Sequence, residues 1–222
     1  MVRVISLSSV GVERGVLEAS FVVRSGGLIV YPTDTVYGMG ADPFNEAAVE
    51  RVFEAKRREA KPMPVLVSSV EAARRLVHVS EEARRLMEAF WPGALTIVLP
   101  SRGLLPSRVS AGLGSVGVRM PSHPVALRLI EACGGALIGT SANISGQPPP
   151  RTVEEALAQL GESVDLALDA GPALHGVPST VIDLSRSEPR LIREGVVKWS
   201  EVARRAIIDY IRKLEGIVSS EE

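Results

Sequence analysis

Short apolar runs alternate with amphipathic stretches along most of the chain, and this alternation limits the folds that the sequence can adopt. The apolar runs are rich in Val, Ile and Leu, as buried strands are, while the stretches between them carry apolar residues at helical spacing. Strands that alternate with helices predict an α/β sheet flanked by helices. Because the last strands follow one another without a helix between them, we expect a mixed sheet rather than a purely parallel one.

The expected elements show no boundary between domains. No composition shift, long linker or internal repeat divides the sequence, so we expect one domain over residues 1–222, closed by an amphipathic helix at about 199–214. The expected strands are 2–7, 27–31, 64–67, 94–99, 116–120, 136–140, 164–168, 180–184 and 190–193. The other expected helices are 12–24, 46–58, 70–77, 80–90, 123–132 and 153–160.

Composition excludes several classes of protein. The 222 residues are 45% hydrophobic and only 4% aromatic, which is typical of an aliphatic α/β core. No apolar run approaches the ~20 residues of a membrane-spanning helix, and the N-terminus lacks the apolar segment of a signal peptide, so we expect a cytoplasmic protein. The net charge of −1 gives no support to a general nucleic-acid binder. Cys133 is the single cysteine, which excludes an internal disulfide.

A polar, glycine-rich segment, YPTDTVYGMGAD at residues 31–42, begins where an expected strand ends. Hydroxyl side chains and glycines beyond a strand are typical of ligand sites in α/β sheets, because the backbone can approach a ligand there and hydroxyls can orient it. Taken alone, the segment is equally compatible with a loop that only turns the chain.

Three basic residues, Lys56, Arg58 and Lys61, lie close together near the expected end of a helix. A lysine supplies a point charge and an arginine supplies a planar fork, and this pair suits a polyphosphate group. Cations at a helix C-terminus also stabilise the helix through its dipole, so the cluster by itself leaves both interpretations open.

A second polar loop, GTSANISG at residues 139–146, follows another expected strand. Its hydroxyl and amide groups, among them those of Ser141 and Asn143, are suited to holding a nucleotide phosphate or ribose without adding charge. An ordinary turn built on Asn or Ser would have the same composition.

Two arginines lie within apolar strand sequences, Arg119 in VGVRM and Arg193 at the end of RLIR. An arginine in such a place lies at a sheet edge or is paired with an anion, since burying it unpaired is costly. A ligand carboxylate is one such anion. The hydroxyl of Ser179, just before another strand, adds a further polar group.

The sequence lacks the motifs of metal sites, catalytic cysteines and the common nucleotide-binding loops. His78, His123 and His175 are scattered without metal-ligand spacing, and Cys133 has no adjacent histidine or second cysteine. The sequence has no GxxxxGK[ST] phosphate loop, no strand-linked GxGxxG and no GxSxG nucleophile elbow. A nucleotide site in this chain would therefore be built without the common motifs.

Seven segments taken together resemble the YrdC/TsaC family of threonylcarbamoyl-AMP synthases. Between residues 26 and 195 they read, in order, YPTDTVYGMGAD, KRREAKP, WPGALTIVL, VGVRMPSHP, TSANISG, PSTVID and RLIREG. The resemblance implies a twisted sheet with a large concave, positively lined ligand cavity. It also implies a reaction in which ATP, L-threonine and bicarbonate give threonylcarbamoyl-adenylate and pyrophosphate, for threonylcarbamoylation of tRNA beside the anticodon.

The resemblance also implies roles for individual residues. The catalytic residues, which would hold the ATP phosphates and the adenylate, are Lys56, Arg58, Ser141 and Asn143. The threonine site would comprise Thr35, Arg119, Gly139 and Ser179. The ATP site would be completed by Lys61, Ser115 and Arg193. Many relatives have a proline where this chain has Glu59, so the alignment of residues 59–68 is open by one residue.

The implied chemistry needs no metal ligands and no catalytic histidine or cysteine from the protein. Threonine's amine and bicarbonate form a carbamate whose oxygen attacks the α-phosphate of ATP, and basic side chains with Mg²⁺ neutralise the developing charge. We expect the ATP phosphates to hold Mg²⁺. The product would pass to a tRNA threonylcarbamoyltransferase complex, and whether tRNA binds this protein directly stays open.

Two alternative functions remain. Hydrogenase-maturation carbamoyltransferases contain the same type of domain and make a carbamoyl-adenylate without threonine, but they carry acylphosphatase-like and zinc-finger regions for which this chain has neither the length nor the cysteines. A non-catalytic RNA-binding module would use the basic cavity, but the near-zero net charge counts against it.

Overall fold

The structure is a computed structural model that describes residues 2–59, 61–186 and 188–205, and it confirms the expected mixed α/β fold. Its strands are β1 (Arg3–Ser6), β2 (Ile29–Tyr31), β3 (Gly38–Gly40), β4 (Val65–Val67), β5 (Leu95–Pro100), β6 (Ser115–Arg119), β7 (Ala136–Ile138), β8 (Thr140–Ser141), β9 (Leu166–Asp169), β10 (Thr180–Asp183) and β11 (Arg190–Arg193). Its helices are α1 (Leu7–Val10), α2 (Val12–Arg24), α3 (Glu46–Ala55), α4 (Val70–Leu76), α5 (Glu81–Phe90), α6 (Pro124–Ala132) and α7 (Val153–Leu160), with a 3-10 turn at Gly161–Ser163.

A further helix begins at Trp199 and is described as far as residue 205, and the rest of the helix expected at 199–214 lies outside the described residues. Within the described part of the chain, no helix combines the length and the apolar character needed to cross a membrane.

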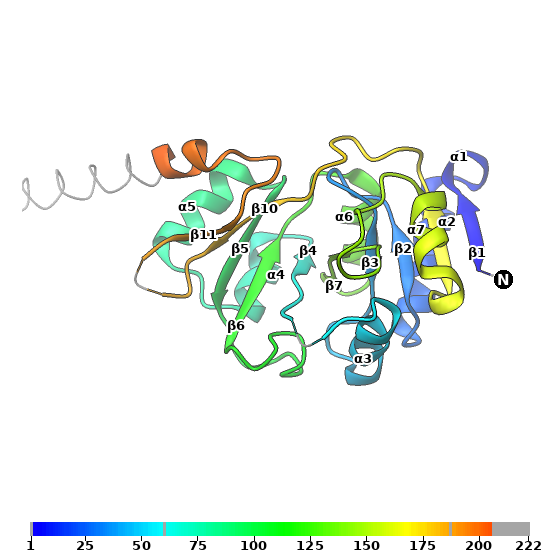
Figure 1. The fold of residues 1–222 in the computed structure, drawn as a ribbon, viewed down its shortest axis with the longest axis horizontal. Helices are drawn as coiled ribbons and strands as arrows, with labels where there is room; N and C mark the ends of the chain where they lie inside the picture. The colour runs from blue at the N-terminus through cyan, green and yellow to red at the C-terminus, as the bar shows by residue number, and fades with distance from the viewer. Residues whose placement is uncertain (1, 60, 187, 206–222) are drawn as a thin grey trace, which may run out of the picture.

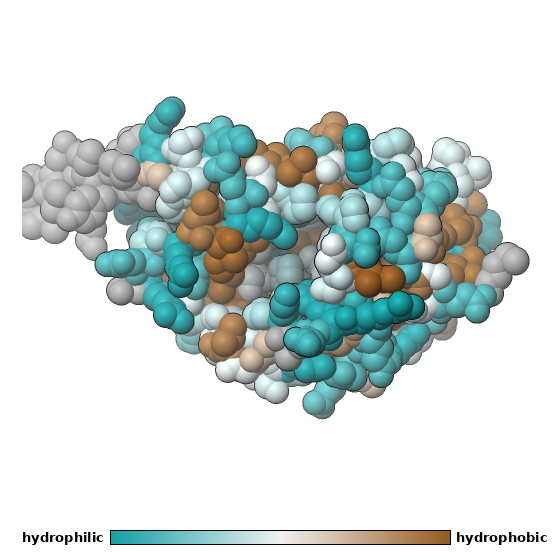
Figure 2. Space-filling view, in the orientation of Figure 1, coloured by the Kyte–Doolittle hydropathy of each residue, from teal (hydrophilic) through white to brown (hydrophobic). Residues whose placement is uncertain are grey.

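The strands form two mixed sheets (Figure 1). One has the order β1-β9-β2-β3-β8 and the other the order β11-β10-β5-β6-β4-β7. In Figure 1 the six-stranded sheet lies on the left with α4 and α5, and the five-stranded sheet lies on the right with α2 and α7. The face seen there carries many hydrophilic side chains over α3, at the lower edge of the space between the sheets (Figure 2).

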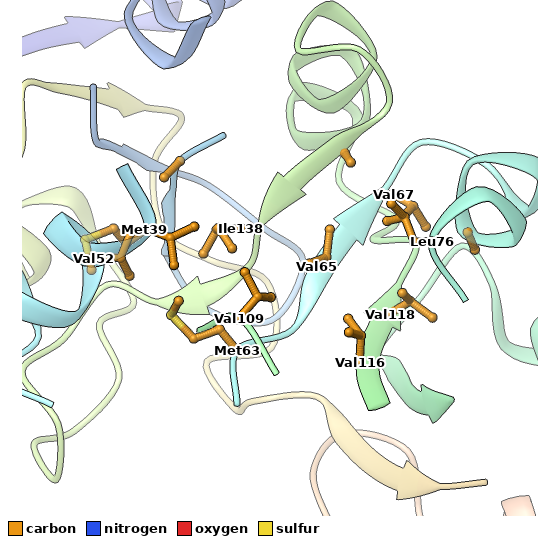
Figure 3. Close-up of a cluster of buried hydrophobic side chains, with 14 of the residues drawn as sticks. Met39, Val52, Met63, Val65, Val67, Leu76, Val109, Val116, Val118 and Ile138 are labelled. Carbon is orange, nitrogen blue, oxygen red and sulfur yellow. The ribbon is translucent and has the colours of Figure 1, made fainter. Parts of the chain in front are cut away.

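The larger of two hydrophobic clusters among the described residues extends across both sheets. Figure 3 shows Met39 of β3 and Val52 of α3 near Ile138 of β7, and the same cluster continues through Val65 of β4 to Val118 of β6. Each of these five residues is almost completely buried. The two sheets therefore share their interior, and this shared core holds their edges close to each other.

The chain passes from one sheet to the other at Gly139. β7 pairs with β4 in the six-stranded sheet, whereas β8 pairs with β3 in the five-stranded sheet, so the single strand expected at 136–140 is wrong. A Cβ atom on Gly139 would lie 2.4 Å from the side chain of Leu66. Glycine is therefore required at the crossing, because any side chain would collide with β4.

Strand β3 lies inside the segment 31–42 and was not among the expected strands. Its glycines make room for the ring of Tyr31, since a Cβ on Gly40 would lie 2.9 Å from that ring. The Tyr31 hydroxyl donates to the Ile138 carbonyl at 3.2 Å. The tight β2–β3 connection holds the polar residues between Tyr31 and Gly38 in one place beside the six-stranded sheet.

Helix α3 ends at Ala55, before the expected end at residue 58. Arg57 takes a left-handed conformation with φ of 48°. The Arg57 N–H donates to the Glu54 carbonyl at 2.9 Å and the Arg58 N–H donates to the Phe53 carbonyl at 3.0 Å. This pair of hydrogen bonds is a Schellman motif, in which the left-handed position is usually glycine. The motif ends the helix and sets the positions of the basic residues on either side of Arg57.

Replacement of Arg57 tests this termination. Arg57→Gly should leave the free energy of unfolding nearly unchanged or raise it, because other residues lose roughly 1–2 kcal/mol in the left-handed conformation. Arg57→Val should lower it, because β-branched residues strongly disfavour that region. Arg74→Gly, inside α4, is the matched control and should cost about 1 kcal/mol in urea denaturation. Equal losses for glycine at positions 57 and 74 would contradict the assignment.

Candidate functional site

A cavity of about 690 Å³ lies between the two sheets. Strands β2, β3 and β8 contribute to it from the five-stranded sheet, and β4, β5, β6, β10 and β11 contribute from the other. All residues that the sequence analysis assigned to the site line this cavity, namely Thr35, Lys56, Arg58, Lys61, Ser115, Arg119, Gly139, Ser141, Asn143, Ser179 and Arg193. The fold thus brings together candidate residues that are far apart in the sequence.

The ammonium group of Lys56 holds the loop that follows β8. It donates to the carbonyl oxygens of Ser141 at 2.5 Å and Asn143 at 2.8 Å, while the Ser145 N–H donates to the Lys56 carbonyl at 2.9 Å. Lys56 is 2% exposed, and burial, together with the nearby charge of Arg58, lowers the pKa of Lys56 to about 7. Two of its three ammonium hydrogens are occupied, which leaves one for a ligand.

In the side-chain amide of Asn143, the nitrogen is used in hydrogen bonds within the protein and the oxygen is left for a ligand. Its Nδ2 donates to the carbonyl oxygens of Ile144 at 2.9 Å and Gln147 at 2.7 Å. Its Oδ1 is buried and has no hydrogen-bond partner within the described chain. An amide oxygen only accepts hydrogen bonds, so this atom suits a ribose hydroxyl better than a phosphate oxygen.

Arg58 lies on the segment between α3 and β4, as Lys61 does. Its Nη2 donates to the Pro62 carbonyl at 2.9 Å, and its Nε is buried without a partner within the described chain. Burial lowers the pKa of Arg58, which means that its charge is incompletely solvated. A bound anion would offset that loss of solvation.

Arg119 is buried against a carboxylate of the chain itself. Its Nη2 donates to Asp34 Oδ1 at 2.6 Å, its Nη1 donates to Thr35 Oγ1 at 3.0 Å, and its Nε donates to the Gly93 carbonyl at 2.8 Å. Arg119 is 5% exposed and Asp34 is 2% exposed. The anion that the sequence analysis required for Arg119 is therefore present within the protein. Sequence reasoning missed Asp34, although a buried arginine needs a carboxylate and the segment 31–42 contains one within a polar loop.

The hydroxyl groups of Thr33 and Thr35 form a chain with a fixed direction. Thr33 Oγ1 donates to the Val36 carbonyl at 2.6 Å and lies 2.9 Å from Thr35 Oγ1. Thr33 Oγ1 also accepts from the backbone N–H groups of Thr35 at 3.2 Å and Val36 at 3.3 Å. Because Thr33 gives its only hydrogen to the Val36 carbonyl, we assign the hydrogen between the two hydroxyls to Thr35. Thr35 also accepts from Arg119. It therefore keeps one lone pair, and no hydrogen, for the cavity.

On the β10 side of the cavity, Arg193 supports Ser179. Its Nε and Nη2 donate to the Ser179 carbonyl at 3.1 and 2.9 Å. Ser179 Oγ lies 2.9 Å from Thr96 Oγ1, and Thr96 also lines the cavity although the sequence analysis did not identify it. Burial, together with the charge of Arg119, lowers the pKa of Arg193. These contacts leave the hydroxyls of Ser179 and Thr96 side by side at the cavity.

Positive charge dominates the described lining of the cavity. The basic residues are Lys56, Arg58, Lys61, Arg119 and Arg193. The acidic residue is Asp183, which sequence reasoning missed and whose Oδ1 accepts from the N–H and hydroxyl of Ser185. No group of three His, Cys, Asp or Glu side chains suited to a metal occurs among the described residues. Asp183 is therefore the carboxylate of the described cavity lining that could contribute to holding a cation.

Comparison with known proteins gives relatives over most of the chain. The sequence model of the Sua5/YciO/YrdC family, described as telomere recombination, matches residues 22–195. A Mycobacterium tuberculosis protein named putative threonylcarbamoyl-AMP synthase is 42% identical over 199 residues, which cover 89% of this chain and 91% of that protein. The threonylcarbamoyl-AMP synthase of Pyrococcus abyssi is 41% identical over 184 residues, which cover 82% of this chain and 54% of that protein.

The crystal structure of Pyrococcus abyssi Sua5 complexed with L-threonine superposes on this fold with a TM-score of 0.87 at 37% identity. The match covers 92% of this chain and 60% of that one, so this chain spans little more than half of the Pyrococcus protein. The family match and the identities of these relatives show that the chain belongs to the Sua5/YciO/YrdC family.

Proposed function

We propose that this chain is an L-threonylcarbamoyl-AMP synthase, a nucleotidyltransferase that uses L-threonine, bicarbonate and ATP. The proposal rests on one observation: all the candidate residues line a single cavity, and basic residues outnumber acidic ones in its described lining. The names of the mycobacterial and Pyrococcus relatives support the activity, and the threonine complex of the Pyrococcus protein supports threonine as a substrate.

In the proposed reaction the amine of threonine attacks the carbon of bicarbonate, and water leaves to give a carbamate. A carbamate oxygen then attacks the α-phosphate of ATP and pyrophosphate leaves. Neither step needs a covalent bond to the protein. The protein has to hold two anionic substrates in reach of each other and to neutralise the charge that develops on the phosphates.

At the nucleotide end, Arg58, Lys61 and Arg193 supply charge to the phosphates. Lys56 adds its one remaining N–H and holds the loop on which Ser141 and Asn143 lie. Ser115 lies on the same cavity wall as Arg119 and contacts the nucleotide.

The free oxygen of Asn143 accepts from a ribose hydroxyl. Leu113 and Ile192, which are 67% and 56% exposed and line the cavity, offer an apolar surface to the adenine. Asp183, the carboxylate of the described cavity lining, could hold Mg²⁺ together with the ATP phosphates, and the ion would add positive charge there.

At the threonine end, Arg119 binds the substrate carboxylate with the terminal N–H groups that Asp34 and Thr35 leave free. The lone pair of Thr35 accepts a hydrogen from the substrate hydroxyl or amine. Ser179 provides a second hydroxyl contact. Gly139 lines the cavity and offers its backbone to the substrate, while Leu66 fills the space that a side chain at this position would need.

The product is a mixed anhydride, so it needs an enzyme that transfers its acyl group before water hydrolyses it. We propose that a tRNA threonylcarbamoyltransferase complex takes the product for modification of tRNA beside the anticodon, in the cytoplasm. The charge surplus of the cavity is accounted for by ATP and threonine, so direct contact with tRNA is not part of this proposal.

Pyrophosphate release separates the candidate functions. With ATP, Mg²⁺ and bicarbonate, the protein should release pyrophosphate rapidly only after L-threonine is added, because the carbamate of threonine is the nucleophile. Serine should lower kcat/KM by about 10- to 200-fold, since one missing methyl group is worth roughly 1–3 kcal/mol in a fitted pocket. An enzyme-coupled assay for pyrophosphate measures both.

Two other outcomes of the same assay contradict the proposal. Release that ignores threonine but increases with carbamoyl phosphate would favour the hydrogenase-maturation reaction. No release at all, combined with tRNA binding that falls steeply as salt rises, would favour the RNA-binding module.

Above pH 7, the binding of ATP should be accompanied by uptake of a proton by Lys56. In the free protein the pKa of Lys56 is about 7, so at pH 8 most molecules carry the neutral amine. Bound phosphate favours the charged form and raises this pKa, so affinity for ATP should fall as the pH rises above 7. Titration calorimetry in buffers of different ionisation enthalpy measures the uptake. Lys56→Arg, which stays charged, should abolish it, and equal uptake by both proteins would assign the proton to another group.

A further inference from the structure

Asp34 is the buried charge that the proposed function leaves without a role. It is 2% exposed and does not belong to the cavity lining, so it can act on a ligand only through a neighbour. Its Oδ1 accepts from Arg119 at 2.6 Å and from the Ser122 N–H at 3.2 Å. Arg119, by contrast, lines the cavity. Any effect of Asp34 on binding therefore passes through the guanidinium group of Arg119.

Three contacts fix that guanidinium group. Asp34 takes a hydrogen of Nη2, Thr35 takes a hydrogen of Nη1, and the Gly93 carbonyl takes the hydrogen of Nε. A guanidinium group has five hydrogens, so one remains on each terminal nitrogen. Two N–H groups on neighbouring nitrogens are the number that a carboxylate accepts in a bidentate pair.

Stability alone does not account for Asp34. Its Oδ2 is buried and has no hydrogen-bond partner within the described chain. A buried ion pair is often no more stabilising than apolar residues of similar volume, and an unpaired carboxylate oxygen adds a further cost. A gain in stability is therefore not a sufficient reason for this pair at the wall of a ligand cavity.

The charge of Asp34 separates Arg119 from the other cations of the cavity. The described lining carries Lys56, Arg58, Lys61 and Arg193 in addition to Arg119, and a phosphate group is attracted to all five. Within the part of the chain that the structure describes, Arg119 is the one of these five cations that forms an ion pair, and Asp34 offsets its charge at 2.6 Å. The guanidinium group of Arg119, with its charge offset by Asp34, still binds the carboxylate of a zwitterionic amino acid by hydrogen bonds. It attracts a doubly charged phosphate much less than an unpaired arginine would.

We propose that Asp34 is a positioning residue that reserves Arg119 for the carboxylate of the amino acid, by orienting its guanidinium group and by cancelling its attraction for phosphate. This inference rests on the proposed function, because it takes threonine as the ligand of Arg119. It assigns Asp34 a part in keeping ATP phosphates and released pyrophosphate out of the threonine end of the cavity.

The test is threonine binding to the full chain by titration calorimetry without ATP, at constant ionic strength, with and without inorganic phosphate. Wild-type protein should bind threonine with little competition from phosphate. Asp34→Asn keeps the shape but removes the charge, and it should weaken threonine binding by about tenfold, a typical coupling for residues in contact. Phosphate should now compete with threonine, which a loss of packing alone would not produce.

Asp165→Asn is the matched control. Asp165 also pairs with an arginine, Arg51, at 3.0 Å and accepts from a backbone N–H, that of Leu28, at 2.7 Å, but it lies away from the cavity. Its replacement should lower the melting temperature and leave both threonine affinity and phosphate competition unchanged.

A second pair of variants covers the case in which Asp34→Asn does not fold. Arg119→Gln and the double variant Arg119→Gln/Asp34→Asn differ only at Asp34, and the double variant has no buried charge at this position. Both should bind threonine with the same weakened affinity, since Asp34 acts through Arg119. A further loss in the double variant would overturn the inference.

The remaining outcomes separate the two proposals. Unchanged threonine binding and no phosphate competition in Asp34→Asn would overturn the role of Asp34 and leave the proposed function intact. Wild-type protein that binds no threonine would overturn the proposed function, and the inference with it.

Discussion

The buried ion pair between Arg119 and Asp34 joins the two sheets at the wall of the cavity, and the geometry of the site depends on it. Asp34 follows β2 of the five-stranded sheet, while Arg119 ends β6 of the six-stranded sheet. Their contact places Thr35 beside Arg119, so a hydroxyl from one sheet and a guanidinium group from the other meet at one point. The shared apolar core brings the sheets together without fixing their register, because packing is non-directional. The directional contacts of Arg119 set the position of one wall relative to the other.

The second wall of the site is built where α3 ends and where β7 gives way to β8. Lys56 holds the loop after β8 through two carbonyl oxygens, and its own carbonyl accepts from the same loop. Gly139 lets the chain cross between sheets against Leu66 without a collision. The candidate nucleotide residues are therefore held by the backbone more than by their own side chains. Such a site is largely formed before a ligand arrives, which lowers the entropy lost on binding.

Patterns along the sequence predicted the elements that depend on local spacing. Helix α2 has the bounds that its apolar periodicity predicted, at residues 12–24, and the assigned site residues do line one cavity. Features that depend on distant contacts were not predictable. The glycines of β3 have low strand propensity and are explained only by the ring of Tyr31. Arg57 occupies a position that sequence rules reserve for glycine, so the end of α3 was placed too late. Asp34 looked like a loop residue because its partner lies on a strand far along the chain.

The directed chain of hydroxyls at Thr35 gives the cavity a point of fixed hydrogen-bond polarity. A threonine hydroxyl normally rotates to meet either a donor or an acceptor. Here the Val36 carbonyl takes the hydrogen of Thr33, Arg119 donates to Thr35, and the hydrogen of Thr35 is directed to Thr33. A ketone or ester oxygen placed against Thr35 would meet a second lone pair with no hydrogen between them. An alcohol placed at the same point can donate its hydrogen to Thr35, so the arrangement favours a hydrogen-bond donor over an acceptor of the same size.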